Sequence, residues 1–261
     1  MAFVKTEVQG AVEIITIDRP KALNALNPEV LADLKAAFEA VDQETIRCIV
    51  LTGEGDKSFV AGADIGSMST MTKAEGEAFG KLGNDVFLMI ESFPIPVIAA
   101  VNGFALGGGN ELAMSCDIRI CSDNAVFGQP EVGLGITPGF GGTQRLARLV
   151  GMGMAKQLVY SALNIKADEA YRIGLVNAVY PQAELMENVL KLANKIAKNA
   201  PIAVRNCKKA INDGISLPIE KAVEVEEKLF GDCFETHDQV EGMGCFLSRE
   251  KPKPKPVFTN N

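Results

Sequence analysis

The sequence predicts an α/β fold, on the strength of two observations. Over the first two-thirds of the chain, short β-branched segments alternate with glycine-rich turns and with segments of helical periodicity. From about residue 184 onward only helical segments follow. The strand–turn–helix units recur without strict sequence repeats, and this rhythm favours parallel strand pairing. A chain of 261 residues, 47% of them hydrophobic, can bury a substantial core in such a fold.

The elements of the first hundred residues follow from β-branched runs and from helix boundary signals. Asn27 is expected to cap a helix that starts at Pro28 and extends to Val41, because apolar residues recur there at helical spacing. A second helix is expected over residues 73–93 and is stopped by two prolines. The expected strands are residues 12–17, 46–52 and 96–101.

Beyond these strands a run of three glycines, residues 107–109, precedes an expected helix over residues 111–115. A further strand is expected over residues 118–121. Later in the chain, helices are expected over residues 185–198, 202–212 and 219–230, followed by an extended, solvated tail of alternating lysine and proline at 251–256. We therefore expect a catalytic core over residues 1–198 and a helical region over residues 199–261.

Composition excludes several classes of protein and of chemistry. A formal net charge of -7 argues against a protein that neutralises nucleic-acid phosphates. The six cysteines contain no C-x-x-C pair, so neither a zinc site nor a disulfide framework is expected. No apolar segment reads as a signal peptide or is long enough to span a bilayer, so we expect a cytoplasmic protein without a membrane partner. The one histidine, His237, lies in a polar stretch, so proton transfer is expected from other groups, carboxylates among them.

The glycine run is the first candidate for chemistry. Glycines before a helix let the backbone approach a ligand closely, and the free N–H groups of the first turn favour negative charge. The P-loop pattern is missing because no Gly-Lys-Ser or Gly-Lys-Thr follows, and the dinucleotide-binding spacing is not met. A developing oxyanion is the better candidate, although a simple turn or packing role remains open.

Two glutamates in glycine-rich segments give this hypothesis more weight. Glu111 follows the glycine run, and Glu131 follows Pro130. On its own, Glu111 is explained as a charge in the first turn of a helix, and Glu131 as a surface charge in a loop. Together they match a general acid and a general base that are held in different protonation states.

Six motifs in order along the chain resemble the enoyl-CoA hydratase/isomerase (crotonase) superfamily, and the resemblance covers essentially the whole chain. These motifs are Asn24-Ala-Leu, Ala61-Gly-Ala-Asp-Ile65, Ala100-Val-Asn-Gly with the three glycines and Glu111-Leu-Ala, Cys116-Asp-Ile, Phe127-Gly-Gln-Pro-Glu131, and Pro138-Gly with Gly-Gly-Thr-Gln-Arg145. The resemblance implies a crotonase-type (ClpP-like) spiral of repeated ββα units, a C-terminal helical trimerisation region and a homo-hexamer built as a dimer of trimers. It implies reversible hydration of a 2-trans-enoyl-CoA. It is strongest to short-chain members that interconvert crotonyl-CoA and 3-hydroxybutyryl-CoA in butyrate-forming bacteria.

The resemblance also implies catalytic roles. The N–H groups of Ala63 and Gly108 would form an oxyanion hole around the thioester oxygen. Glu111 would act on the water or hydroxyl group at the β-carbon, and Glu131 would exchange the proton at the α-carbon. No metal and no separate cofactor is implied, because coenzyme A enters as part of the acyl-CoA substrate. Asn110 departs from the pattern, since many relatives carry cysteine directly before the glutamate.

Substrate-binding roles are implied in the same way. Ala61 and Ile65 would line the adenine end of the coenzyme A pocket, Gln129 would help to orient the carboxylates, and the Gly139 backbone would hold the water. The candidates for lining the acyl pocket are Met68, Phe87 and Phe140.

Three alternative functions fit the sequence less well than hydration does. An isomerase of this family, which shifts a double bond, can manage with one carboxylate, so the presence of both Glu111 and Glu131 favours hydration. A hydrolase is disfavoured because no nucleophile stands out. An RNA-binding relative would carry a lysine-rich early helix, and residues 28–41 contain only Lys35.

Overall fold

Two β-sheets form the centre of the structure, a computed structural model that describes residues 2–261. The larger sheet has six strands in the order β1-β2-β3-β5-β7-β10, and the smaller has four in the order β4-β6-β8-β9. The strands of the larger sheet are β1 (Val4–Gln9), β2 (Val12–Ile17), β3 (Cys48–Gly53), β5 (Val97–Val101), β7 (Ile118–Ser122) and β10 (Ala178–Tyr180). Those of the smaller sheet are β4 (Ser58–Val60), β6 (Phe104–Leu106), β8 (Val126–Gly128) and β9 (Ile165–Lys166).

The expected parallel pairing is confirmed in the larger sheet. Strands β2, β3, β5, β7 and β10 pair in parallel, and only β1 is antiparallel to its neighbour. The four strands expected from β-branched runs correspond to β2, β3, β5 and β7. Every residue of β3 and β5 is buried, which explains the continuous apolar runs that identify these strands in the sequence.

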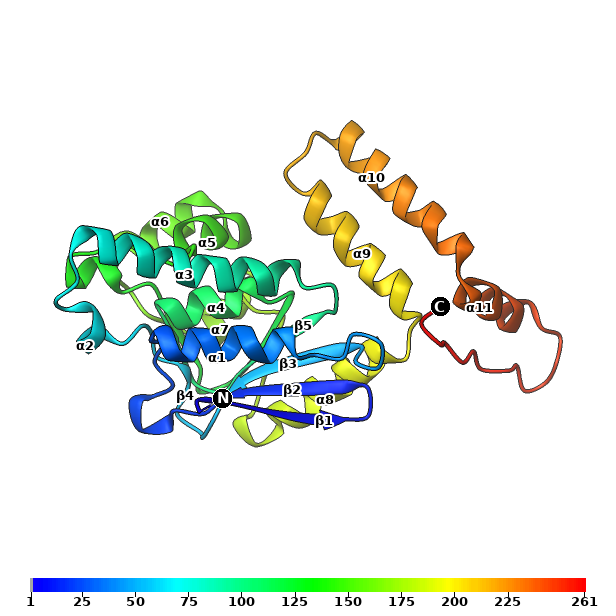
Figure 1. Ribbon diagram of the computed structural model, residues 1–261, viewed down its shortest axis with the longest axis horizontal. Coiled ribbons are helices and arrows are strands. Elements are labelled where there is room, and N and C mark those ends of the chain that lie inside the picture. The colour runs from blue at the N-terminus through cyan, green and yellow to red at the C-terminus, as the bar shows by residue number, and fades with distance from the viewer. Residues whose placement is uncertain (1) are drawn as a thin grey trace.

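Helices cover both faces of this sheet (Figure 1). On one face lie α1 (Pro28–Glu39) and α3 (Lys73–Ser92), which contribute buried residues such as Leu34 and Phe87 to the main core. On the other face α8 (Leu185–Ala197) packs Leu185, Val189 and Ala193 against the central strands. The sheet is therefore a rigid layer between helices, from which loops lead to the smaller sheet.

Helix boundaries follow the capping signals in the sequence. The Asn27 side chain accepts a hydrogen bond from Val30 N at 2.8 Å, so α1 begins as expected. Thr72 and Glu75 form a capping box at the start of α3, and α3 ends before the expected proline pair. The remaining α-helices of the core are α2 (Ile65–Met68), α4 (Gly108–Ser115), α5 (Gly142–Val150), α6 (Met152–Ser161) and α7 (Ala167–Arg172). The short 3-10 helices are η1 (Pro20–Ala22), η2 (Glu131–Leu134), η3 (Gln182–Glu184) and η4 (Cys233–Glu235).

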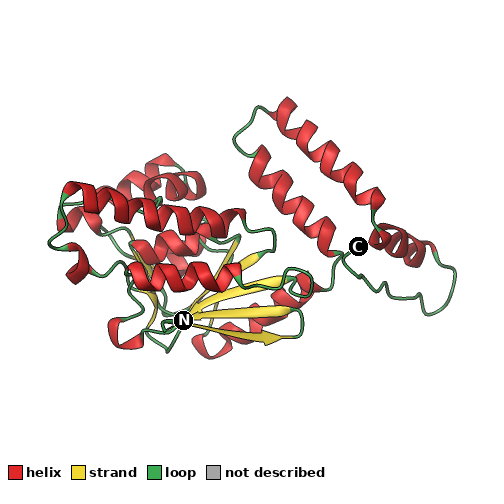
Figure 2. Cartoon of the chain, viewed as in Figure 1, coloured by secondary structure: helices red, strands yellow, loops and turns green. Residues whose placement is uncertain are grey.

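The last helices extend away from the sheets (Figure 2). They are α9 (Pro201–Gly214), α10 (Ile219–Asp232) and α11 (His237–Leu247), and the chain after residue 247 has no regular structure. Two of the three were expected from the sequence, and α11 was not. His237 is exposed at the start of α11, as expected for a surface residue. Within residues 2–261 no helix is long and apolar enough to cross a membrane.

Candidate active site

A cavity of about 660 Å³ opens between α2 and α3 on one side and the start of α4 with η2 on the other. It brings together segments that are far apart in the sequence, from the loop after β4 to the turn before α5. Most of the predicted site residues line it, namely Ala61, Ala63, Ile65, Met68, Gly108, Glu111, Glu131, Gly139 and Phe140. Gln129 and Phe87 are not among the lining residues.

The glycine run forms the sharp entry to α4. Gly107 has φ +50°, a conformation that disfavours residues with a side chain, and its N–H donates to Gly128 O at 2.9 Å. A Cβ on Gly109 would overlap the carbonyl of Val60, so glycine is required for α4 to pack against β4. Gly108 is the first helical residue, where the backbone N–H has no acceptor within the helix. One free N–H group therefore lies at the cavity wall.

A second free N–H group comes from the segment after β4. Leu26 N donates to Gly62 O at 2.8 Å, and Asp64 N donates to Leu26 O at 2.7 Å, which together form a parallel bridge between Leu26 and Ala63. In such a bridge the N–H of Ala63 lies on the opposite side of the segment. Ala63 lines the cavity, as Gly108 does.

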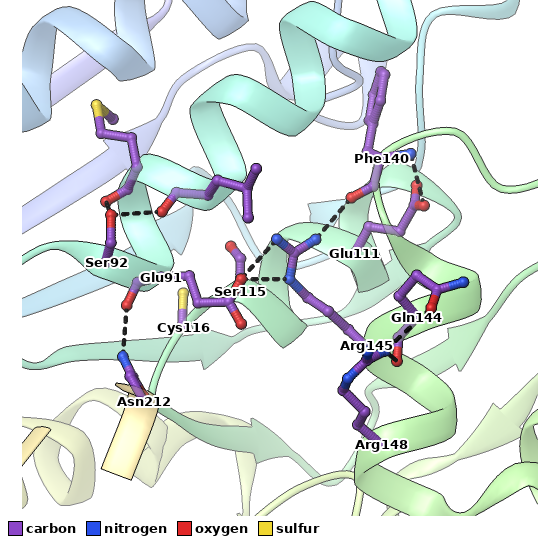
Figure 3. Close-up of polar contacts among 12 residues, drawn as sticks. Glu91, Ser92, Glu111, Ser115, Cys116, Phe140, Gln144, Arg145, Arg148 and Asn212 are labelled. Carbon is purple, nitrogen blue, oxygen red and sulfur yellow. Dashed lines mark hydrogen bonds and ion pairs between the residues drawn. The ribbon is translucent and has the colours of Figure 1, made fainter. Parts of the chain in front are cut away.

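Glu111 is held in the first turn of α4 with only 1% of its surface exposed. Its Oε1 accepts a hydrogen bond from Phe140 N at 2.9 Å, which Figure 3 shows, and another from Gly142 N at 2.7 Å. These two donors lie where the chain enters α5, whose first residue is Gly142. One carboxylate oxygen is thereby fixed by main-chain donors.

Glu131 reaches the same cavity from η2, and it is 9% exposed. Its Oε1 lies close to the glycine run, since a Cβ on Gly107 would be 2.8 Å away. Its buried Oε2 has no hydrogen-bond partner within the part of the chain that the structure describes. Glu131 thus lines the same cavity as Glu111, and one of its carboxyl oxygens has no partner among residues 2–261.

Both carboxyl groups favour their protonated forms more than they would in water. Burial, and then the charge of Glu131, raises the pKa of Glu111 to about 7, against the lowering effect of its two amide donors. Burial also raises the pKa of Glu131. Depth of burial alone would place a shared proton on Glu111. The two amide donors at Glu111 oppose this, because they stabilise the ionised form, and Oε2 of Glu131 has no such donor.

Gln129 lies against the backbone of the Gly107 turn, which leads into the helix that carries Glu111. It is fully buried, and with its amide oriented to satisfy the neighbouring carbonyls its nitrogen donates to Gly107 O at 3.0 Å and to Gly128 O at 2.8 Å. Glu111 N in turn donates to Gly107 O at 2.9 Å. Among residues 2–261 no hydrogen bond joins Gln129 to either carboxylate, so its observed contact with Glu111 runs through the Gly107 turn.

Comparison with known proteins decides the family. The family described as Enoyl-CoA hydratase/isomerase matches residues 7–257, which is nearly the whole chain. This chain belongs to the enoyl-CoA hydratase/isomerase family. The family membership that the six sequence motifs predict is confirmed.

Two curated members of the enoyl-CoA hydratase/isomerase family are similar over most of their length. The chain is 58% identical to the short-chain-enoyl-CoA hydratase of Clostridium acetobutylicum, over 94% of each chain. It is 55% identical to the crotonyl-CoA hydratase of Syntrophomonas wolfei, over 94% of this chain and 95% of that one. The crystal structure of an enoyl-CoA hydratase from Bacillus anthracis covers 99% of this chain and 100% of its own, with 37% identity and a TM-score of 0.95. The expected crotonase-type fold is therefore confirmed.

The residues that line the inner wall of the cavity differ from those expected from the sequence at one position. Phe140 and Met68 line the cavity as expected, but Phe87 does not; its ring packs behind Phe140 with 5.6 Å between centroids. The lining aromatic residue on α3 is Phe79, whose ring centroid lies 5.1 Å from that of Phe140. Phe79 and Phe87 both face inward from α3, so helical periodicity alone does not tell which one reaches the cavity.

Gly83 explains how the Phe140 ring fits beside α3. A Cβ at Gly83 would overlap the Cδ1 atom of Phe140. The sequence places Gly83 within a helix but does not indicate that it packs against Phe140.

Within residues 2–261 no three His, Cys, Asp or Glu side chains gather as metal ligands, and the expectation that no metal is used stays a prediction.

Proposed function

We propose that this protein is an enoyl-CoA hydratase that reversibly adds water across the 2,3 double bond of a short-chain 2-trans-enoyl-CoA such as crotonyl-CoA. One observation carries the proposal: two buried carboxyl groups from separate segments line one cavity beside two free main-chain N–H groups. The names of the two curated relatives agree with this activity.

The N–H groups of Ala63 and Gly108 would bind the thioester oxygen. A thioester α-proton is too weakly acidic for a carboxylate alone, and charge builds up on this oxygen as the enolate forms. Each preorganised donor would stabilise that charge by about 3–4 kcal/mol, on the scale of other oxyanion holes. The gain arises only as charge develops, so it accelerates the reaction instead of merely tightening substrate binding.

The two glutamates would divide the proton transfers. In hydration, the carboxylate of Glu111 takes a proton from water while the water oxygen bonds to the β-carbon. The carboxylic acid of Glu131 then gives its proton to the α-carbon, and the enolate electrons form the new C–H bond. In dehydration every step reverses, with Glu131 taking the α-proton and Glu111 returning a proton to the leaving hydroxyl. The amide donors at Glu111 and the unpaired oxygen of Glu131 support this division.

The ends of the cavity suggest how the substrate lies. We propose that the nucleotide part of coenzyme A binds near Ala61 and Ile65, and that the acyl group points toward Phe79 and Phe140. The Gly139 backbone would contact the water. Coenzyme A enters as part of the substrate, so the proposed reaction uses no separate cofactor. The binding energy of the nucleotide would position the acyl end against the carboxyl groups.

The C-terminal helices are proposed to bind further copies of this chain. Several large apolar side chains on α9, α10 and α11 are exposed, among them Ile211, Phe230, Phe246 and Leu247. Apolar side chains gathered on helices that extend from the core are typical of an association surface. A hexamer built as a dimer of trimers is the assembly that we propose.

The test follows the fate of labelled water. Purified protein is incubated with crotonyl-CoA in water labelled with oxygen-18, and the acyl-CoA products are analysed by mass spectrometry. The expected product is 3-hydroxybutyryl-CoA that carries one labelled oxygen. A shifted double bond without label would instead identify an isomerase.

Glu111→Gln and Glu131→Gln are each expected to lower turnover by about 100-fold or more, since each removes one of the two proton-transfer groups. Glu77→Gln, an exposed carboxylate on α3, is the matched control.

A further inference from the structure

The turn of residues 139–142 carries both donors that hold Glu111. Phe140 N and Gly142 N donate to the same oxygen, Oε1, so two alternate peptide groups of one turn point at a single carboxylate oxygen. Glu111 is held correctly only when both peptide planes have their present orientation. The peptide group between them, Phe140–Gly141, links the two donor groups, so its orientation is coupled to theirs.

Arg145 on α5 holds this middle peptide group. Its Nη1 donates to Phe140 O at 2.9 Å, as Figure 3 shows, and its side chain is only 9% exposed. Gly141 has φ +96°, and a Cβ there would overlap Arg145 Nη1. The turn is thus built so that a guanidinium group fits directly beneath it.

The first peptide group of the turn is anchored from α3. Asn84 Nδ2 donates to Gly139 O at 2.8 Å and to Gly80 O at 2.9 Å. Gly139 O and Phe140 N belong to the same peptide group, so a donor on the carbonyl side strengthens the N–H that Glu111 accepts. The last peptide group is anchored by α5, since Arg145 N donates to Gly141 O at 2.9 Å.

Arg145 is itself fixed by Glu91 near the end of α3. Its Nε and Nη2 donate to Glu91 Oε2 at 3.1 and 2.8 Å. The Glu91 backbone carbonyl accepts from Asn212 Nδ2 of α9 at 3.1 Å (Figure 3). The guanidinium therefore uses three N–H groups at once, two toward Glu91 and one toward the turn.

We propose that Arg145 is a positioning residue for the hydratase reaction. It fixes the Phe140–Gly141 peptide group, so that the two flanking N–H groups hold Oε1 of Glu111 and leave Oε2 to face the water. The proposal rests on the function proposed for the cavity. Arg145 acts only through the turn, and it is not among the residues that line the cavity.

Loss of Arg145 has a definite consequence for the turn. Phe140 O would become a buried acceptor without its donor, and a buried unsatisfied group favours a rearrangement that restores a partner. A rotation of that peptide group that is not compensated within the turn moves the flanking N–H donors relative to Glu111. A misplacement of about 1 Å at a reacting group can lower the rate on the order of 100-fold.

The charged groups that act on Glu111 give a second readout. Burial, and then the charge of Glu131, raises the pKa of Glu111, whereas the amide donors of Gly142 and Phe140 and the charge of Arg145 lower it. Removal of Arg145 takes away its charge and weakens both amide donors. The acidic limb of the kcat/KM profile, below which Glu111 is protonated, is therefore expected to move to higher pH.

The deciding experiment is a double-mutant cycle with crotonyl-CoA as substrate. Arg145→Met is introduced into the wild type and into Glu111→Gln, and Arg148→Met, an exposed position on the same helix, is the matched control. In the wild type, Arg145→Met is expected to lower kcat on the order of 100-fold while KM changes much less. In Glu111→Gln the same change is expected to lower the residual rate by no more than about threefold, because the carboxylate that it positions is absent. Arg148→Met is expected to leave both backgrounds unchanged.

Equal losses in both backgrounds would overturn the proposal, because Arg145 would then act by supporting the fold in general. Wild-type hydration in the isotope experiment is measured first, so a failed function is distinguished from a failed positioning role. If Arg145→Met does not fold, Arg145→Lys replaces it in the cycle, since lysine keeps the charge but cannot reach Glu91 and Phe140 O together. A lower kcat with the shifted acidic limb supports the proposal, and a wild-type profile contradicts it.

Discussion

Replacing Glu111 with glutamine is expected to stabilise the fold at neutral and higher pH while it removes activity. The carboxyl group is buried, and its pKa is raised from 4.5 to about 7. At about 1.4 kcal/mol for each pH unit, this rise means that the ionised group destabilises the folded state by about 3 kcal/mol. Glutamine keeps an oxygen that can accept from Phe140 N and Gly142 N, but it carries no charge to bury. We therefore expect a gain of about 3 kcal/mol in the free energy of unfolding.

The gain has a defined pH window. Because the pKa of Glu111 is higher in the folded state, the folded protein binds this proton more tightly than the unfolded chain does. The stabilising effect of that proton is complete below the unfolded pKa and is lost as the pH rises through about 7. Glu111→Gln should thus differ little from the wild type at about pH 4.5 and should reach its full advantage above about pH 7.

Urea denaturation of both proteins at about pH 4.5 and about pH 8, at one protein concentration, measures this difference. The matched control is Glu77→Gln, which removes an exposed carboxylate and should give no comparable gain. If Glu111→Gln is no more stable than the wild type at the higher pH, Glu111 is not a strained, buried carboxylate. The same holds if its advantage is equal at both pH values.

Two further predictions concern the walls of the cavity. Phe79→Ala enlarges the space beside Phe140. In steady-state kinetics, we expect it to raise kcat/KM for a six-carbon 2-enoyl-CoA about 10-fold relative to kcat/KM for crotonyl-CoA. An unchanged ratio would show that the acyl group lies elsewhere. Gly108→Pro removes one N–H donor and is expected to abolish hydration, whereas Gly108→Ala keeps the N–H, with its Cβ 3.2 Å from the Phe140 ring, and should stay active. Similar turnover by the two Gly108 variants would reject the oxyanion-hole role.

The sequence predicts those elements that carry a strong local pattern. Strands β2, β3, β5 and β7 are β-branched and buried, and α1 and α3 have clear capping residues. Strand β1 was not expected, because only Val4 of its six residues is buried and no alternation marks it. The strands of the smaller sheet have only two or three residues each, which is too short for a period to be read. Helix α11 was missed because it begins in a polar stretch and contains Gly242 and Gly244.

The site could be predicted only in part from its own residues. The glycine run and the two glutamates indicate an anion site and acid–base chemistry, but their spacing alone does not bring Glu111 and Glu131 to one cavity. The prediction that Glu111 and Glu131 share one site rests on the family resemblance. The expectation that Phe87 lines the acyl pocket was wrong, because Phe79 and Phe87 both face inward from α3 and it is Phe79 that reaches the cavity. Arg145 stands in a recognised motif, yet its partners lie 5 and 54 residues away and only the fold brings them together.

Several expectations from the sequence stay predictions. Among them are the division into a catalytic core and a helical region at residue 198, the roles of the site residues, a reaction without a metal or separate cofactor, the cytoplasmic location and the hexamer. The exposed apolar side chains of α10 and α11 support association without fixing the number of copies.

A crystal structure with a bound, unreactive β-keto acyl-CoA tests the proposed geometry most directly. We expect the thioester oxygen to lie within about 3 Å of both Ala63 N and Gly108 N. Glu111 and Glu131 should then face the β- and α-carbons from within the same cavity. A thioester oxygen that is bonded to other groups, or a glutamate that points away from these carbons, would contradict the mechanism.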